Sequence, residues 1–290
     1  MVERPESVKY GPRTLFWRQV FVNDSIPPFL WASIDIAHGI MQTASTRRHY
    51  ANAPITEAVI DIQIDNVSGK TIEDLTTLAD RLKDEFPVRL PVYQLQVGFQ
   101  TDAVGEISQH QDKQSLGWRL HSKDQKRVLQ IRTNGFTYSH LPPYSNWETF
   151  SAEAVALWNS YLSAIEPQSA RRLAVRVINR LPVDSSDGDL STVVNVYPRV
   201  PDKISAEARS LAVQLQLPVV TVDKDALLNL SLFTGFTSNS EGGLILDIDL
   251  FIERPTAIGP QIFETINKLG NAKDDIFEAC ITDLIRERIQ

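Results

Sequence analysis

Residues 171–182, near the middle of the chain, read Arg-Arg-Leu-Ala-Val-Arg-Val-Ile-Asn-Arg-Leu-Pro. Aliphatic residues recur at every second position, with Arg176, Ile178 and Arg180 between them. Successive side chains of a β-strand point to opposite faces, so this alternation predicts a strand with one apolar and one cationic face. The apolar face would hold Leu173, Val175, Val177 and Leu181. We expect this strand to be the seam between two halves of the chain.

Upstream of this stretch, regular signals begin at about residue 53. Isoleucines alternate with polar residues at 57–65, which predicts a half-buried strand. Thr71 and Asp74 have the spacing of a capping box, and apolar positions at helical spacing predict a helix over 72–86. Further strands are expected at 93–100, 117–122, 127–133 and 136–141, with an Asn-Gly turn before the last, and then a helix with a second candidate capping box at Ser145 and Glu148.

The second half shows the same order less regularly. Residues 190–217 are ambiguous, with a short strand expected at 193–197 and a short helix at 205–215. Three strands are expected after them, at 219–223, 226–233 and 243–252. A helix over 258–269 should be interrupted by Gly270 and Asn271, and a final helix is expected over 273–288.

Together these elements predict an α+β fold of two β-rich halves with mostly antiparallel sheets, each closed by a C-terminal helix. The first half would span residues 49–168 and the second 169–290. Residues 1–48 show no sustained period of about 2 or 3.6 residues. We therefore expect a poorly ordered extension or a misassigned start there, with Met41 as the true first residue.

The composition is that of an ordinary soluble protein, with 42% hydrophobic and 22% charged residues. A net charge of −7 disfavours nucleic acid and anionic lipid as partners, without excluding a local basic groove. The single cysteine, Cys280, excludes an internal disulfide and is expected to be an inert core thiol. No apolar run is long enough to cross a bilayer, so we expect a cytoplasmic protein without a membrane partner.

Several segments, in matching order, resemble a sporadically distributed family of uncharacterised prokaryotic proteins. The family pattern begins with the Pro-Ile-x-Glu-Ala strand at 54–58, continues with Arg-x-Ile-Asn-Arg at 176–180 and ends in the Phe-Glu-Ala-x-Ile-Thr helix at 277–282. The resemblance covers about residues 50–287 and supports Met41 as the start. The family has no established activity, so the resemblance implies no catalytic residues.

Charged side chains on three predicted strands form the strongest candidate site. They are Asp61 and Asp65, Arg176 and Arg180, and Asp247 and Asp249, with Asn179 beside the arginines. If the strands are neighbours, these residues form either a solvated face with cross-strand ion pairs or a groove whose arginines grip a carboxylate or phosphate. The two aspartates of Asp247-x-Asp249 could also bind a divalent metal, although Arg176 would compete with the cation. We expect no bound metal or cofactor.

Aromatic residues form a second candidate, with Trp118 and Tyr144 as ligand-binding residues. Together with Phe136, Tyr138, His121 and His140, they lie near several lysines and arginines. Such aromatics could stack on nucleic-acid bases, but they more commonly belong to a core.

No motif for nucleophilic, nucleotide-binding or metalloprotease chemistry occurs in the sequence, so enzymatic activity stays open. The leading hypothesis is a binding or interaction module that recognises a protein or small molecule through a polar sheet face or the groove between halves. The alternative is an enzyme acting on a phosphorylated or nucleotide substrate through Asp247, Asp249 and Arg176. A homo-oligomer is also open.

Overall fold

The computed structural model describes residues 48–101 and 107–290, except for 185–186, 188, 199–200, 202, 204–209 and 236–242. The extension expected before residue 48, with Met41, lies outside this range. Two compact units divide the chain: Tyr93–Ser115 belongs to one, and Ile36–Val92 with Leu116–Gln290 forms the other. The site residues discussed below all belong to the second, larger unit.

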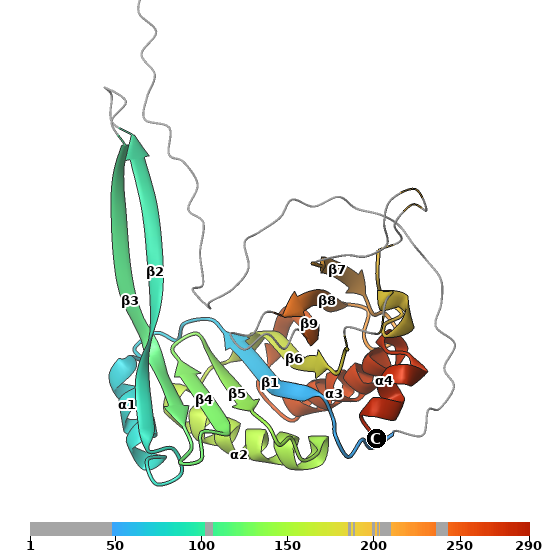
Figure 1. Ribbon diagram of the computed structural model, residues 1–290. Helices are drawn as coiled ribbons and strands as arrows, with labels where there is room; N and C mark the ends of the chain where they lie inside the picture. The colour runs from blue at the N-terminus through green and yellow to red at the C-terminus, as the bar shows by residue number, and fades with distance from the viewer. Residues whose placement is uncertain are drawn as a thin grey trace, which may run out of the picture. The chain divides into compact units, whose positions relative to one another are not determined.

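The larger unit is built on an antiparallel sheet (Figure 1). In chain order the elements are β1 (Ile55–Ile64), α1 (Ile72–Arg81), β2 (Val88–Thr101), β3 (Ile107–His121), β4 (Arg127–Arg132), β5 (Gly135–His140), α2 (Trp147–Ile165), β6 (Ser169–Leu181), a 3-10 turn η2 (Leu190–Thr192), β7 (Ala212–Pro218), β8 (Ala226–Gly235), β9 (Gly243–Ala257), α3 (Gln261–Cys280) and α4 (Asp283–Arg288). This confirms the α+β class.

The nine strands form one continuous sheet in the order β2-β3-β4-β5-β1-β6-β9-β8-β7. The prediction was of more than one sheet. Instead, β1 pairs directly with β6, so the strands before and after residue 168 belong to the same sheet. On each side of this β1–β6 seam, the chain crosses to an edge of the sheet and returns strand by strand. The predicted central strand is therefore β6, paired with β1 and β9.

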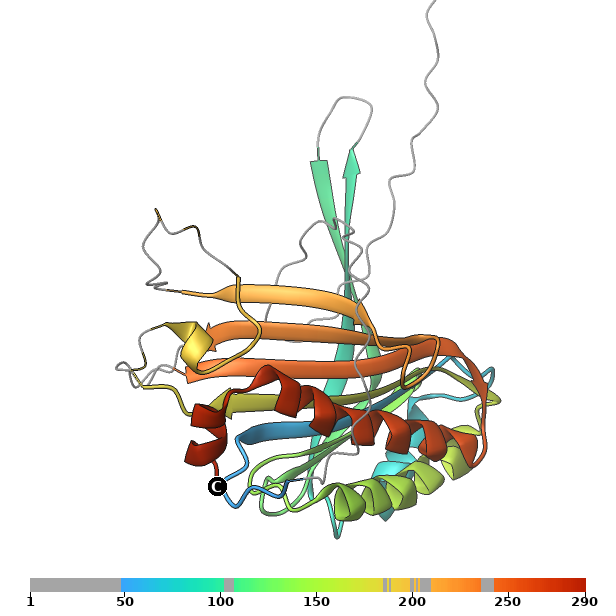
Figure 2. The same cartoon turned by 90° about the vertical axis from the view of Figure 1, so that its right-hand side faces the viewer.

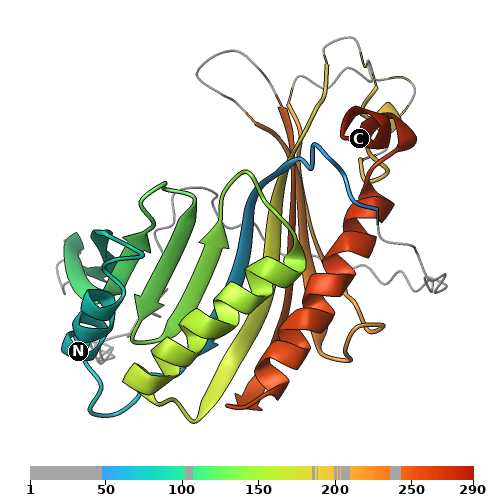
Figure 3. The ribbon, with the colours of Figure 1, turned by 90° about the horizontal axis from the view of Figure 1, so that it is seen from below.

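Helices cover one face of the sheet (Figure 3). Helix α1 packs beside α2, α2 packs beside α3, and α3 lies against β6 and β9. The core fills the space between helices and sheet, and Leu173, Val175, Val177 and Leu181 of β6 are all buried in it. Alternation thus predicted the faces of β6 correctly, because a strand that is covered on one side sends every second side chain into the core.

The first predicted helix cap is confirmed, and the second is wrong. Thr71 and Asp74 form a reciprocal capping box at the start of α1. For α2, the cap is Asn146, whose side-chain oxygen accepts from Thr149 N at 2.8 Å, rather than the pair Ser145 and Glu148. An asparagine at this position satisfies a free helical N–H as well as serine does.

The expected break at Gly270 does not occur, because α3 runs through it to Cys280. A β-carbon at Gly270 would lie 2.1 Å from Cζ2 of Trp147, so the glycine lets α3 pack directly on that indole. The actual break comes at Ile281 and Thr282, before α4. Helix–helix packing, not a turn, explains this glycine.

The segment before β8 was predicted least well. Residues 212–215, expected at the end of a helix, belong to β7, and residues 219–223, expected as a strand, form turns. In the expected strand over 193–197, Val194 makes one isolated bridge to Ile281. Part of the expected helix, residues 205–209, lies outside the described chain.

Candidate functional site

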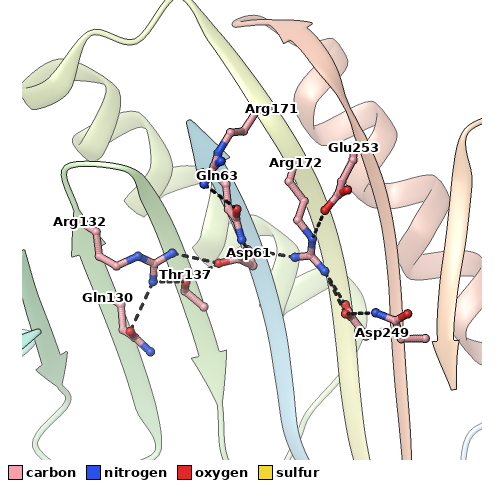
Figure 4. Close-up of polar contacts among 10 residues, drawn as sticks. Asp61, Gln63, Gln130, Arg132, Thr137, Arg171, Arg172, Asp249 and Glu253 are labelled. Carbon is pink, nitrogen blue, oxygen red and sulfur yellow. Dashed lines mark hydrogen bonds and ion pairs between the residues drawn. The ribbon is translucent and has the colours of Figure 1, made fainter. Parts of the chain in front are cut away.

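A row of charged side chains crosses β4, β1, β6 and β9 on the face of the sheet away from the helices (Figure 4). Arg172 lies at its centre, with Nη1 donating to Asp61 Oδ2 at 3.1 Å and Nη2 donating to Asp249 Oδ2 at 2.9 Å. Beyond Asp61, Arg132 donates from Nη2 to Asp61 Oδ1 at 3.2 Å. We call the four residues Arg132, Asp61, Arg172 and Asp249 the arginine–aspartate ladder.

Neighbouring polar side chains also donate hydrogen bonds to the ladder's carboxylates. Thr137 donates to Asp61 Oδ1 at 2.6 Å, and Asn229 donates to Asp249 Oδ2 at 3.4 Å. The guanidinium of Arg172 also lies 4.6 Å from the centre of the Phe251 ring. The Asp61, Arg172 and Asp249 side chains are only 14–18% exposed. Each ladder carboxylate is therefore shielded and already bound by more than one donor.

The two ladder aspartates differ in the direction of their pKa shifts. Burial alone would raise the pKa of Asp61, but Arg132, Arg172 and the Thr137 hydroxyl outweigh it and hold the pKa below its usual range. Burial raises the pKa of Asp249, and the attraction of Arg172 and Arg176 only partly opposes this. Asp61, which two ladder arginines contact, is thus the more firmly ionised of the two.

A separate ion pair joins Arg176 of β6 to Asp247 of β9. Nε donates to Asp247 Oδ1 at 2.8 Å and Nη2 donates to Oδ2 at 2.5 Å, which is the bidentate geometry of strong arginine–carboxylate pairs. The hydrogen bond to Asp247 raises the pKa of Arg176 despite burial. Arg176 keeps 39% of its side chain exposed, whereas Asp247 is nearly buried.

The sequence therefore placed Asp61, Arg176, Asp247 and Asp249 correctly on one interleaved face. Asp65 follows the end of β1 and is exposed. Arg180 lies on β6, opposite Ile245 of β9. Two arginines at the ladder's key positions, Arg172 and Arg132, were not predicted as site residues. Alternation places Arg172 on the same face as Arg176 and Arg180, but its role depends on the carboxylates of Asp61 and Asp249, which lie on neighbouring strands.

Little in this geometry favours a metal at Asp247-x-Asp249. Both Asp247 oxygens accept from Arg176, and both Asp249 oxygens accept from Arg172. A divalent cation would have to displace these guanidiniums. Within the described ranges, no group of three or more His, Cys, Asp and Glu side chains could hold a metal ion.

A pocket of about 510 Å³ lies elsewhere in the larger unit. Residues 48–55 and 142–148 line it from the first half of the chain, and Val177, Asn179 and residues 273–275 and 277–278 line it from the second. We call this space the inter-half pocket. Two of the proposed ligand-binding residues, Tyr144 and Asn179, lie in its lining.

Lys273 is a buried cation in the pocket lining. Its side chain is 3% exposed, and Nζ donates to Asp274 Oδ1 at 2.5 Å. The same Nζ lies 5.2 Å from the centre of the Trp147 ring, within the range of a cation–π contact. Burying an ammonium group without a partner is costly, and these two contacts offset that cost for Lys273.

Tyr144 brings an unpaired polar group to the same region. Its hydroxyl oxygen is buried and has no hydrogen-bond partner among the described residues. Burial raises the pKa of Tyr144, and the nearby carboxylates of Asp274 and Glu148 raise it further, so the phenol stays neutral. A buried hydroxyl without a partner costs roughly 1–3 kcal/mol. Tyr144 therefore keeps a hydrogen-bonding capacity that the described residues do not meet, although its hydroxyl oxygen is closed to solvent.

Other pocket residues have structural contacts. The Tyr50 hydroxyl donates to Glu278, which also accepts from Arg286 Nε at 2.9 Å. These bonds attach the segment before β1 to α3 and α4. Asn179 is 1% exposed and its Nδ2 donates to the Leu246 carbonyl at 3.1 Å, so its amide nitrogen braces β6 against β9.

The remaining aromatic candidates belong to packing contacts. Trp118 lies apart from the pocket, with Nε1 donating to Thr76 at 3.0 Å and the Arg89 guanidinium 4.7 Å from its ring centre. Phe136 and Tyr138 are fully buried, as expected for core aromatics. Cys280 is buried, as predicted for a core thiol, and burial raises its pKa to about 12.

Comparison with protein-family models, curated proteins and solved structures finds no match to this chain. In the part of the chain that the structure describes, the helices are too short or too polar to cross a membrane. Functional inference therefore rests on the geometry of the ladder and of the inter-half pocket.

Proposed function

We propose that the protein is a cytoplasmic binding module that recognises a small molecule in the inter-half pocket. The observation that carries the proposal is the pocket itself, whose volume of about 510 Å³ falls in the range of small-molecule sites, roughly 300–1,000 Å³. Aromatic walls and a few polar groups, here Trp147, Phe277, Tyr144 and Lys273, are the usual composition of such sites.

The charges around the pocket favour a neutral or cationic ligand with an apolar body. Four carboxylates line it, from Glu148, Asp274, Asp275 and Glu278, against the cations of Arg48 and Lys273. Lys273 is already paired with Asp274, and Glu278 is paired with Arg286, so an anionic ligand would meet the charges of Glu148 and Asp275 with Arg48 opposing them. An organic ammonium group could instead approach the carboxylates and the aromatic faces together.

The two-halves architecture belongs to the same proposal. Strands β1–β5 with α2 would form one half and β6–β9 with α3 the other, with the pocket where the halves meet. The similar path of the chain on either side of the β1–β6 seam supports this division. The two halves differ in the connection after their first strand. The β1–β2 connection contains helix α1, whereas the described residues of the β6–β7 connection contain the 3-10 turn η2.

Three probes of matched shape test the pocket: 2-phenylethylamine, 2-phenylethanol and phenylacetate. We expect the amine to raise the melting temperature most and phenylacetate least. At a probe concentration of about ten times Kd, binding adds about 1.4 kcal/mol, or a few degrees. Ala53→Trp fills the pocket from an exposed position and should abolish the shift.

Ala156→Trp is the matched control, because Ala156 is exposed on α2 and does not line the pocket. It should leave the amine's effect intact. Equal responses of the Ala53→Trp and Ala156→Trp proteins would place the binding elsewhere and contradict the proposal. Tighter binding of phenylacetate than of the amine would contradict only the assigned ligand charge and would leave the pocket as the binding site.

The enzyme hypothesis, with Asp247, Asp249 and Arg176 acting on a phosphorylated or nucleotide substrate, stays a separate prediction. The exposure of Arg176 favours it, and the arginine pairing of both carboxylates speaks against it. A nucleotide-dependent thermal shift that Arg176→Ala removes and Ala53→Trp preserves would support this alternative over the pocket.

A further inference from the structure

Strand β7 forms one edge of the sheet, beyond β8 (Figure 2). It pairs antiparallel with β8 along its whole length, from Ala212 opposite Phe233 to Pro218 opposite Leu227. In the described part of the chain, its other side pairs with no strand. That side presents backbone N–H and C=O groups that can extend the sheet.

The sequence of β7, Ala-Val-Gln-Leu-Gln-Leu-Pro, contains no charged residue. Natural edge strands are commonly protected by charges and prolines within the strand. The opposite edge strand, β2, follows this rule with Arg89 and Pro91 near its start. In β7 the single proline comes last, so the strand before it lacks such protection.

An apolar stripe on β7 continues the core beyond the helix layer. Val213, Leu215 and Leu217 lie opposite Leu232, Leu230 and Leu228 of β8, which are buried. Helix α3 packs on β6 and β9, two strands further in. Leu215 and Leu217 are consequently 37% and 41% exposed, although they share the face of the core. Apolar side chains at an open edge are where an added strand gains most.

We propose that two copies of this chain associate through antiparallel pairing of their β7 strands about a twofold axis at Leu215. Leu215 is the midpoint of β7, so this register pairs the full length of both strands. Leu215 would lie opposite the partner's Leu215, and Val213 opposite the partner's Leu217. A twofold axis perpendicular to the sheet keeps these side chains on one face.

The absence of charge is what makes the strand self-complementary. In a twofold pair the residue on the axis faces its own copy, so a charge at Leu215 would face a like charge, and the apolar side chain there avoids this repulsion. With Leu215 on the axis, Gln214 lies opposite the partner's Gln216, and two amide side chains can hydrogen-bond to each other. The proposal is independent of the inter-half pocket.

Sedimentation equilibrium of the full chain at micromolar concentration tests the association. We expect the wild type to show twice the monomer mass, and Leu215→Lys and Leu215→Glu each to show the monomer mass. Mixing the two variants should restore the dimer, because lysine then lies opposite glutamate across the axis. Leu90→Lys changes a leucine on the other edge strand that is 48% exposed, somewhat more than Leu215, and should leave the dimer intact.

A monomeric wild type would overturn the proposal, as would a dimer that persists in the Leu215→Lys protein. Failure of the mixed variants to associate, while each remains folded by circular dichroism, would overturn the twofold register at Leu215. Restoration in the mixture cannot arise from misfolding, so it separates lost pairing from lost structure.

Discussion

The arginine–aspartate ladder and the inter-half pocket place charges in the protein in two different ways. In the ladder, neighbouring strands hold each carboxylate against an arginine, and the ladder aspartates receive several donors each. In the pocket, the side chains come from a lead segment, a loop and a helix, and Tyr144 keeps a hydroxyl without a partner among the described residues. Regular pairing satisfies the ladder internally, whereas one pocket residue keeps a hydroxyl that no described residue pairs.

This difference separates stability from recognition. Breaking a buried ion pair leaves an uncompensated charge, which costs several kcal/mol, so the ladder should matter for folding. A pocket group that makes few internal contacts should matter little for folding and more for binding. Charged residues on a strand are thus a weaker sign of a ligand site than a polar group that the fold leaves unpaired.

The largest effect is expected from Arg172→Met, which keeps the length of the side chain but removes the charge between Asp61 and Asp249. It should lower the free energy of unfolding by about 3 kcal/mol in urea titrations, since two shielded carboxylates lose a shared partner. Arg171→Met is the matched control. Arg171 is exposed and, within the described part of the chain, its side chain donates to Gln63 at 3.1 Å, so the loss should stay within about 0.5 kcal/mol. Equal losses in the free energy of unfolding for both variants would contradict a special contribution of the ladder to stability.

A smaller, pH-dependent effect is expected from Asp61→Asn, about 2 kcal/mol at neutral pH. The folded protein holds the pKa of Asp61 below its unfolded value, so the carboxylate stabilises the fold above that value. This stability is lost as the pH falls through the folded pKa. The difference in free energy of unfolding between the wild type and the variant should therefore become smaller below about pH 4.

Asp249→Asn gives the opposite trend, because burial raises the pKa of Asp249. Protonation of Asp249 then favours the folded state. As the pH falls, the wild type should therefore gain free energy of unfolding relative to the variant. Urea titrations of both variants across the acid range measure these slopes. Parallel slopes for the two aspartates would contradict the asymmetry of the ladder.

The smallest effect is expected from Tyr144→Phe, which removes the unpaired hydroxyl at the pocket. Stability should change by less than about 0.5 kcal/mol, or rise slightly. Tyr161→Phe is the comparison, because the Tyr161 hydroxyl donates to the Arg132 carbonyl at 2.7 Å and its loss should cost about 1 kcal/mol. Thermal unfolding of the two variants checks this difference. Equal costs would mean that the Tyr144 hydroxyl has a partner.

Alternation and helical spacing were enough to predict most strands, the main helices and the buried face of β6, because each depends on local periodicity. The predictions that were wrong concern residues whose structure depends on contacts with parts of the chain distant in sequence. Gly270 looked like a helix break, but its role is to admit Trp147, more than a hundred residues earlier. Residues 212–215 became strand because β8 offers them a pairing partner.

The same limit applies to the site. Arg176 and Asp247 were identified from simple alternation. Arg172 lies on the same face as Arg176, but its central position depends on which carboxylates the neighbouring strands place beside it, and the sequence does not show that. The pocket was named only as a groove between halves, because its lining joins residues 48–55, 142–148, 273–275 and 277–278 through tertiary packing. Tyr144 and Asn179 were singled out on other grounds, and nothing local linked them to Lys273.

The most direct test of the central claim follows the indole N–H resonances during a titration with 2-phenylethylamine. Trp147 lines the pocket and its Nε1 donates to Asn267 at 3.1 Å, whereas Trp118 lies apart from the pocket and bonds to Thr76. With assignments from Trp→Phe variants, we expect the Trp147 resonance to move and saturate while Trp118 stays fixed. Saturable binding that leaves Trp147 unmoved would contradict the account and place recognition outside the inter-half pocket.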